Sequence, residues 1–303
     1  MERGATITDY IVTRCANALH RIPAGNGRPF VYDLNPYRGC EHRCQYCFAQ
    51  YSHGYLEDED YFEHIYVKEN IAERLDRELF RRSWNGGPVN LGGITDSYQP
   101  CEARFQLMPD IWRVLIKHRT PCIISTKSSL ILRDYDLVER LAAMTFVNVA
   151  CTVTTLDADI AGRIEPRAAR PANRLEVLQA FARTKATIGL HMMPIIPHLT
   201  GGKENIERLH QAAKEAGADY VLPGLLNLRG KTRDVFFACV AREFPDRYKA
   251  VFAACKTGWV DQDYQKAVFA KIRQAQAAHQ INGDYMIFWR RWQADRGQQL
   301  SLF

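Results

Sequence analysis

Short, almost continuous apolar runs alternate with longer amphipathic stretches through the middle of the chain. Six such runs are present, at Phe30–Leu34, Val89–Ile94, Cys122–Thr126, Phe146–Thr154, Ala186–Ile196 and Tyr220–Leu226. Runs of this kind are typical of strands that are buried on both faces of a parallel sheet. The stretches around and between them predict covering helices near 61–82, 103–119, 133–143, 171–184 and 203–216.

About six strand–helix units in a row indicate an α/β fold, a partial (β/α)6 barrel related to the TIM barrel. In such a barrel the functional side chains lie in loops at the C-terminal ends of the strands. We expect an N-terminal extension over 1–24, the barrel over 25–230, a helical C-terminal segment over 231–295 and a flexible tail over 296–303. A cysteine-rich loop follows the first strand and should therefore lie at the mouth of the barrel.

The composition describes a chain with a large core and a mild excess of positive charge. The 303 residues are 47% hydrophobic and carry a formal net charge of +6. We find no secretory leader pattern and no apolar run of about eighteen residues, which excludes the membrane-spanning class and predicts a soluble, cytoplasmic protein. The charge excess suits an anionic partner such as DNA, although a solvated basic surface explains it equally well.

Three of the nine cysteines follow one another closely, in the pattern Cys40-x3-Cys44-x2-Cys47. In a reducing compartment we expect free thiols or metal ligands, not disulfides. A loop of this length can place three thiolates around a cubane [4Fe–4S] cluster, which leaves the fourth iron open to bind a small molecule. The alternative is a tetrahedral zinc site that His42 or His53 completes.

The spacing of these cysteines, with Tyr46 before the third, resembles the signature of the radical S-adenosylmethionine (SAM) superfamily. Further segments resemble the branch related to spore photoproduct lyase, described as DNA-repair photolyase-like. They are "LNPYRGCEHRCQYCFAQYSH", "GGITDSYQPCE", "ISTKSSLILRDYDLVERL", "TVTTLDADIAGRIEPRAARPANRLEVL" and "MMPIIPHLT". The resemblance implies a [4Fe–4S] cluster on Cys40, Cys44 and Cys47 and SAM on the open iron. It also implies cleavage of SAM to a 5′-deoxyadenosyl radical, and an electron donor such as flavodoxin or ferredoxin.

The same resemblance suggests which residues contact SAM. It puts the Tyr46 ring near the adenine and Lys127, at a strand end, against the carboxylate of SAM. The amino group would meet the loop after the second strand, at Gly92, Gly93, Thr95 and Asp96.

Other candidate SAM contacts come from the residues themselves. The hydroxyls of Thr152 and Thr154 can hydrogen-bond the ribose, although threonines are also ordinary strand residues. Glu165 and Arg167 can either pair with each other or line the cofactor site. His191, Met193 and Pro194 fit an adenine wall or a plain core.

One feature departs from the lyase pattern. In that enzyme a cysteine just before the counterpart of "TD" returns a hydrogen to the substrate, and here that position reads Gly93 or Ile94. Cys101 is the candidate replacement and Tyr98 lies nearby. Cys151 alternates out of phase with Thr152 and should face the helices.

The chain ends in Gln299, Leu300, Ser301, Leu302 and Phe303, which resemble the peptide that docks on the bacterial DNA sliding clamp. The first functional hypothesis is thus a radical SAM enzyme acting on DNA, in repair or base modification. The second is a radical SAM enzyme acting on a small molecule, a peptide or RNA. The third is a non-catalytic iron–sulfur or zinc protein that binds nucleic acid.

Overall fold

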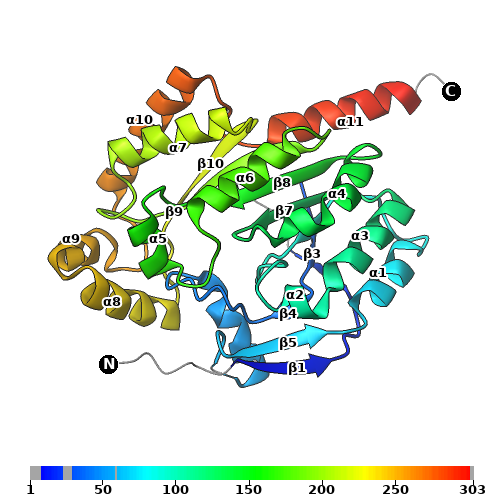
Figure 1. Ribbon diagram of the computed structural model, residues 1–303, viewed down its shortest axis with the longest axis horizontal. Helices are drawn as coiled ribbons and strands as arrows, with labels where there is room; N and C mark the ends of the chain where they lie inside the picture. The colour runs from blue at the N-terminus through cyan, green and yellow to red at the C-terminus, as the bar shows by residue number, and fades with distance from the viewer. Residues whose placement is uncertain (1–7, 23–28, 59, 301–303) are drawn as a thin grey trace.

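The computed structural model describes residues 8–22, 29–58 and 60–300, with side chains through residue 296. Its centre is a seven-stranded sheet in the order β10-β9-β8-β7-β6-β3-β2 (Figure 1). The strands are β2 Leu19–Arg21, β3 Tyr32–Leu34, β6 Val89–Leu91, β7 Cys122–Thr126, β8 Val147–Thr152, β9 Thr187–Ile195 and β10 Tyr220–Leu225. All neighbours from β3 to β10 are parallel, and only β2 pairs antiparallel within this sheet. The predicted α/β fold with six parallel strands is therefore confirmed.

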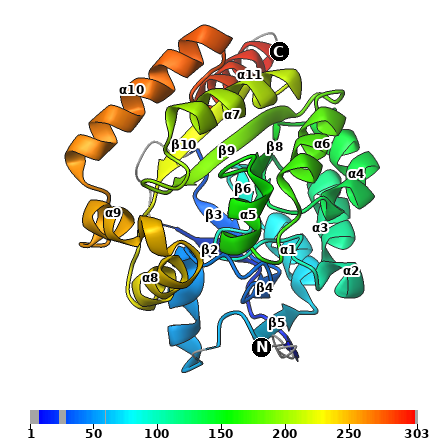
Figure 2. The same cartoon turned by 60° about the vertical axis from the view of Figure 1, so that its left-hand side comes forward.

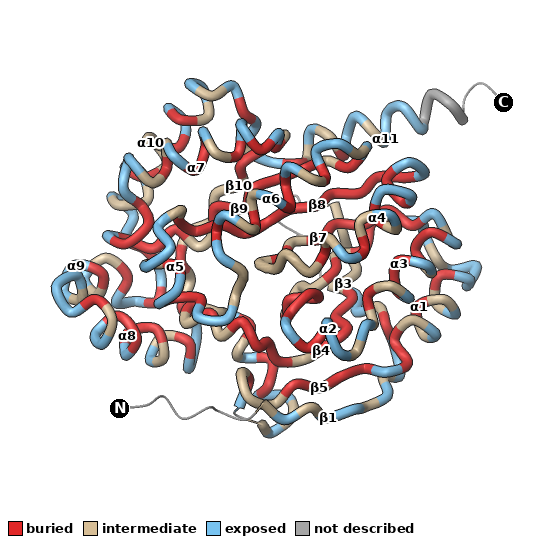
Figure 3. Tube along the Cα trace, in the orientation of Figure 1, coloured by how far each residue is buried: buried red, intermediate tan, exposed pale blue. Residues whose placement is uncertain are grey.

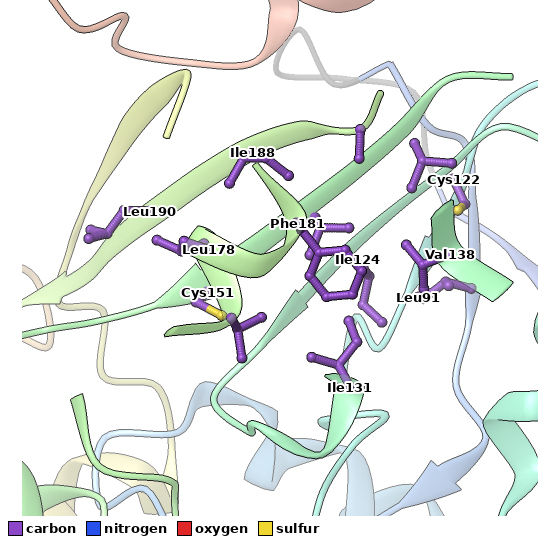
Figure 4. Packing of buried hydrophobic residues seen from close by; sticks show 14 of the residues in the cluster. Leu91, Cys122, Ile124, Ile131, Val138, Cys151, Leu178, Phe181, Ile188 and Leu190 are labelled. Carbon is purple, nitrogen blue, oxygen red and sulfur yellow. The ribbon is translucent and has the colours of Figure 1, made fainter. Parts of the chain in front are cut away.

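Helices cover the outer face of this curved sheet. They are α1 Ile71–Leu79, α3 Leu107–His118, α4 Tyr135–Ala142, α6 Pro171–Phe181 and α7 Lys203–Glu215. Two short helices lie elsewhere: α2 Glu102–Phe105 packs beside Tyr37, and α5 Ala158–Ile164 packs against the cysteine loop. Leu178 and Phe181 of α6 pack with Ile188 and Cys151 of the strands in one continuous apolar core (Figure 4). Buried residues follow the strands and the inner sides of these helices (Figure 3). Cys151 faces the helices, as its position in the strand predicts.

The predicted helix at 61–82 is wrong in its first part. Residues His64–Lys68 form β5, which lies between β1 (Asp9–Thr13) and β4 (Tyr37–Arg38) in a separate three-stranded sheet. Ile65 and Val67 are buried on one side, so the segment has the period of two that a strand requires, and β-branched residues suit it. The helix α1 begins only at Ile71.

The C-terminal segment is helical, as predicted. It contains α8 Lys231–Glu243, α9 Pro245–Cys255, α10 Gln262–His279 and α11 Met286–Leu300, and α11 therefore continues past the expected boundary at 295. Val268, Ile272 and Ala275 of α10 join the main core beside α7. The candidate clamp peptide Gln299–Phe303 lies outside the residues whose side chains are described, so it stays a prediction. No described helix has the length and apolar character needed to cross a bilayer.

A glycine inside β9 makes room for a tyrosine of the neighbouring strand. Gly189 is paired in register with Tyr220, whose ring fills the space above it. A Cβ atom at Gly189 would lie 2.0 Å from Cζ of Tyr220. The Tyr220 hydroxyl is held by Asn148 Nδ2 at 2.9 Å and by Nε2 of His191 at 3.1 Å, so the ring cannot swing away from the glycine without losing both contacts.

We predict that Gly189→Ala lowers the free energy of unfolding by about 2 kcal/mol or more, because the added methyl group overpacks a buried site. Urea denaturation of the two proteins measures this change. A Cβ added at Gly162 in α5 would meet no atom within 4 Å, so Gly162→Ala is the matched control. It should leave stability unchanged or raise it by up to about 1 kcal/mol, since alanine favours a helix. Equal losses from both substitutions would contradict the packing argument.

Candidate active site

A cavity of about 420 Å³ opens at the C-terminal ends of the parallel strands. Its size is within the range of small-molecule sites. Every strand from β6 to β10 contributes to it at or just beyond its end, and the cysteine loop closes one side. The lining residues used below are Cys40, His42, Cys44, Tyr46, Cys47, Phe48, Gly92, Gly93, Thr95, Asp96, Ser125, Thr126, Lys127, Thr152, His191, Met193, Pro194 and Asn227.

The cysteine loop is anchored at Gly39, immediately before the first cysteine. The carbonyl of Gly39 accepts hydrogen bonds from Oγ1 of Thr95 at 2.6 Å and from Nε2 of Gln99 at 3.1 Å. Gly39 has a φ of +82°, and a Cβ there would lie 2.4 Å from the carbonyl oxygen of His64. Only glycine therefore fits this turn. Thr95, predicted to contact SAM, lines the cavity and also holds the cysteine loop in place.

The spacing of the three thiols bears on the choice between zinc and an iron–sulfur cluster. In a tetrahedral zinc site the Zn–S distance of about 2.3 Å brings the sulfurs within about 4 Å of one another. Over the described residues, only Asp58, Asp60 and His64 bring three or more candidate ligand atoms within 4.8 Å of each other. The three cysteine sulfurs therefore do not have the spacing of a tetrahedral zinc site in this structure, whereas a four-iron cluster takes each thiolate on a separate iron.

The histidines of the zinc alternative have other contacts. His42 Nε2 lies 3.1 Å from Oδ2 of Asp96, and His53 Nε2 lies 3.1 Å from the carbonyl of His64. The thiols are also buried, which favours their protonated form. Burial raises the pKa of Cys44 to about 12, although Lys127 opposes this shift. Any metal that binds these thiols must release their protons. Three thiols that line one cavity at more than zinc spacing fit a [4Fe–4S] cluster on Cys40, Cys44 and Cys47.

Asp96 connects the cysteine loop to the end of β7. Its Oδ1 accepts hydrogen bonds from Oγ1 of Thr126 at 2.7 Å and from the backbone N–H of Tyr98 at 2.9 Å. Its Oδ2 accepts from the backbone N–H of Lys127 at 2.7 Å and lies beside His42. Burial would raise the pKa of Asp96, but His42 and these donors hold it well below its usual value. Because a carboxylate has about four acceptor positions, Asp96 orders the site and offers little to a SAM amine.

Lys127 presents a cation to the cavity. Its ammonium lies 5.8 Å from the centroid of the Tyr46 ring. Burial would lower the pKa of Lys127, but the neighbouring Cys44 and Glu165 raise it, so the side chain stays charged. Within the described part of the chain no carboxylate is at ion-pair distance from its Nζ atom. An anionic group of a bound ligand can therefore pair with it.

A buried ion pair stands behind Tyr46. The Tyr46 hydroxyl donates a hydrogen bond to Glu165, and Oε2 of Glu165 lies 2.6 Å from Nη2 of Arg174. Arg174 also donates to the carbonyls of Thr152 at 2.8 Å and Ala169 at 2.7 Å. Burial would raise the pKa of Glu165, but Arg174 and Lys127 outweigh it and lower the pKa. Arg174 is not among the predicted residues, because a single arginine in a helix carries no signal of its partners.

Most of the predicted cofactor residues come together in the cavity. Tyr46, Gly92, Gly93, Thr95, Asp96, Lys127 and Thr152 all line it, as do His191, Met193 and Pro194. Gly93 also has a close neighbour within the protein, because a Cβ there would lie 2.3 Å from Oδ2 of Asp33. The close neighbour of this glycine is thus a protein carboxylate.

Two of the predicted cofactor residues lie elsewhere. Thr154 stands beyond the end of β8 and outside the cavity lining. Arg167 is partly exposed, and its nearest carboxylate is Glu41 at 3.9 Å. The alternative that Arg167 pairs with Glu165 is therefore wrong, since Glu165 pairs with Arg174.

Neither candidate hydrogen donor reaches the cavity. The Tyr98 hydroxyl donates to Oδ2 of Asp134 at 2.8 Å and accepts from Nε1 of Trp112 at 2.6 Å, deep in the core. Cys101 precedes α2 and is buried against Tyr37 in a separate apolar cluster. Among the described residues, the cysteines that line the cavity are the three predicted cluster ligands.

Comparison with known proteins gives a family, relatives and a fold. The family model of the Radical SAM superfamily matches residues 34–213. An uncharacterized protein of Mycobacterium tuberculosis (strain H37Rv) is 33% identical over 277 residues, which cover 89% of this chain and 81% of the relative. An uncharacterized protein of Methanocaldococcus jannaschii is 27% identical over 168 residues, 55% of this chain and 61% of the relative.

Among solved structures, a double mutant of spore photoproduct lyase with bound AdoMet and dinucleoside spore photoproduct has a similar fold. The TM-score is 0.67 at 14% identity, over 89% of this chain and 79% of that chain. At this identity the likeness concerns the fold alone.

We predict that Arg174→Ala lowers the free energy of unfolding by about 3–5 kcal/mol, because it leaves the Glu165 carboxylate buried without its partner. Urea denaturation provides the measurement. The control is Arg77→Ala in the pair Arg77–Glu73, whose side chains are 62% and 48% exposed. That change should cost less than about 1 kcal/mol. If both substitutions cost the same, the buried pair does not hold this side of the site together.

Proposed function

The chain belongs to the radical SAM superfamily, and we propose that its cavity is the site at which it cleaves SAM to modify a DNA substrate. Members of this superfamily are enzymes that use a [4Fe–4S] cluster and SAM. The observation that carries the proposal is the convergence of three cysteines and one cation, Lys127, on a single cavity at the strand ends. SAM on a reduced cluster supplies a 5′-deoxyadenosyl radical in this superfamily.

Each residue of the cavity then has a role that its chemistry supports. Cys40, Cys44 and Cys47 would hold a [4Fe–4S] cluster on the side of the cavity that the cysteine loop closes. The Lys127 ammonium pairs with the carboxylate of SAM. The hydroxyl of Thr152, 3.2 Å from Oγ of Ser125, belongs to a polar floor that suits the ribose. The burial of these groups keeps water away from a reactive radical.

DNA is the substrate class that the remaining observations favour. The chain carries a net charge of +6, which suits a polyanion. The solved lyase of similar fold holds a dinucleoside in its own structure. The described cavity lining offers no thiol besides the cluster ligands, so we favour a repair or base-modification reaction that needs no cavity cysteine as hydrogen donor. An electron donor such as flavodoxin or ferredoxin would reduce the cluster.

We predict that Cys44→Ala abolishes both cluster loading and SAM cleavage, because it removes one of three thiolates. The protein is reconstituted anaerobically with iron and sulfide, and iron content, visible absorbance and 5′-deoxyadenosine after dithionite and SAM are measured. The wild type should hold about four irons per chain. The matched control is Cys239→Ala, which removes a buried thiol of α8 outside the cavity and should leave the cluster intact. A Cys44→Ala protein with a full cluster would refute the assignment.

The DNA assignment has its own test. We expect 5′-deoxyadenosine production by the loaded wild type to rise several-fold when UV-irradiated DNA is added, since substrate binding completes the site. Untreated DNA of the same sequence is the control. If neither DNA changes the production of 5′-deoxyadenosine, the assignment as a radical SAM enzyme stands but DNA is not the substrate. The substrate would then be sought among peptides, small molecules and RNA.

A further inference from the structure

Exposed aromatic side chains lie on two segments that adjoin the cavity. Phe48 lines the cavity directly after Cys47 and is 49% exposed. It begins the 3₁₀ helix η1 (Phe48–Leu56), in which Tyr51 is 50% exposed and stacks near it with ring centroids 6.4 Å apart. Trp259, 55% exposed, lies in the segment between α9 and α10. We call Phe48, Tyr51 and Trp259 the aromatic rim.

The two parts of the rim are both connected to the cavity. Asn227 lines the cavity just after β10 and forms an antiparallel bridge with Trp259. Thr232, in the first turn of α8, donates a hydrogen bond from Oγ1 to the carbonyl of Cys47 at 3.0 Å. The helix α8 therefore lies beside η1, as both views of the chain show (Figures 1 and 2). Both parts of the rim thus adjoin the cysteine loop or the cavity lining.

The α8 side of this surface is basic. Arg229, Lys231 and Lys256 are exposed, and the Arg229 guanidinium carbon lies 5.4 Å from the centroid of the Trp259 ring. Arg233 donates from Nε to the carbonyl of Lys256 at 3.1 Å, which brings the two positive residues together. We call Arg229, Lys231, Arg233 and Lys256 the basic rim; Asp234 and Asp261 are exposed acidic residues near it in the sequence. Glu57 and Asp58 follow the far end of η1, so the positive charge is confined to the α8 side.

We propose that the aromatic and basic rims bind single-stranded DNA and feed one unstacked nucleotide into the cavity. Exposed aromatic rings stack on bases that have left the duplex, while guanidinium and ammonium groups track the phosphates. A base inside a duplex already stacks on its neighbours and cannot use such faces. An enzyme that modifies a base must also extrude it to reach it. This inference rests on the proposed function and specifies that the DNA substrate is bound as a single strand.

The test is anisotropy of a fluorescein-labelled oligothymidylate of about twenty nucleotides with the anaerobically reconstituted protein. We expect the wild type to bind this strand more tightly than the matching duplex with oligodeoxyadenylate. The double variant Tyr51→Ala/Trp259→Ala should bind the strand about tenfold or more weakly, since two stacking contacts are lost. Lys256→Gln should reduce the slope of log affinity against log salt by about 0.7, the value for one phosphate contact on a single strand.

The matched control is Phe80→Ala. Phe80 is 82% exposed at the end of α1, away from the mouth, and its removal should leave affinity unchanged. Thermal unfolding midpoints of all variants, with Tyr51→Ala measured alone, show whether a loss reflects misfolding. A strand that binds no better than the duplex, or rim variants that bind like the wild type, would overturn the proposal. SAM cleavage without DNA is measured on the same preparation, so loss of the cluster chemistry is distinguished from failure of the rim.

Discussion

The buried carboxylate of Asp96 is the interaction on which the arrangement of the site depends. The loops at the ends of parallel strands have no shared backbone ladder, so something else must fix them relative to one another. On one side Asp96 accepts hydrogen bonds from the hydroxyl of Thr126 and the backbone N–H of Lys127. On the other side it contacts His42 of the cysteine loop. A buried charge is stable only when its donors are all in place. The carboxylate thus links the position of the thiols to that of the Lys127 ammonium.

Arg174 and Glu165 perform the same task on the opposite side of the cysteine loop. Glu165 accepts a hydrogen bond from the Tyr46 hydroxyl, and Arg174 donates one to the carbonyl of Thr152 at the end of β8. The cysteine loop is therefore held by two buried carboxylates, Asp96 toward β7 and Glu165 toward β8. Lys127 lies between them, and its ammonium faces the ring of Tyr46. Among the described residues, no carboxylate is at ion-pair distance from this ammonium. The positive charge of Lys127 can therefore pair with an anionic group of a ligand.

Much of the fold could be predicted from the sequence, because buried parallel strands leave apolar runs whatever their partners are. The strand β5 could not, since five residues with a period of two are short beside the helix that follows. The three thiols follow from the cysteine spacing, while the glycine loop and Lys127 follow from the family resemblance and from their places at strand ends. Arg174 does not, because its partners Glu165 and Tyr46 are set by tertiary contacts, and Tyr46 and Glu165 are 119 positions apart. The positions of Cys101 and Tyr98 could not be predicted either. Both are close in sequence to the glycine loop, but sequence separation does not show to which side of a turn a side chain points, and both lie away from the cavity.

The C-terminal helices belong to the site as much as the barrel does. The cysteine loop rests on a second apolar cluster in which Cys44 and Tyr46 pack with Phe236 and Phe237 of α8. Thr232 of the same helix holds the carbonyl of Cys47. A helix that supports the loop from outside also places its own basic residues beside the mouth. The segment that supports the three cysteines is therefore also the segment that lies beside the approach to the cavity.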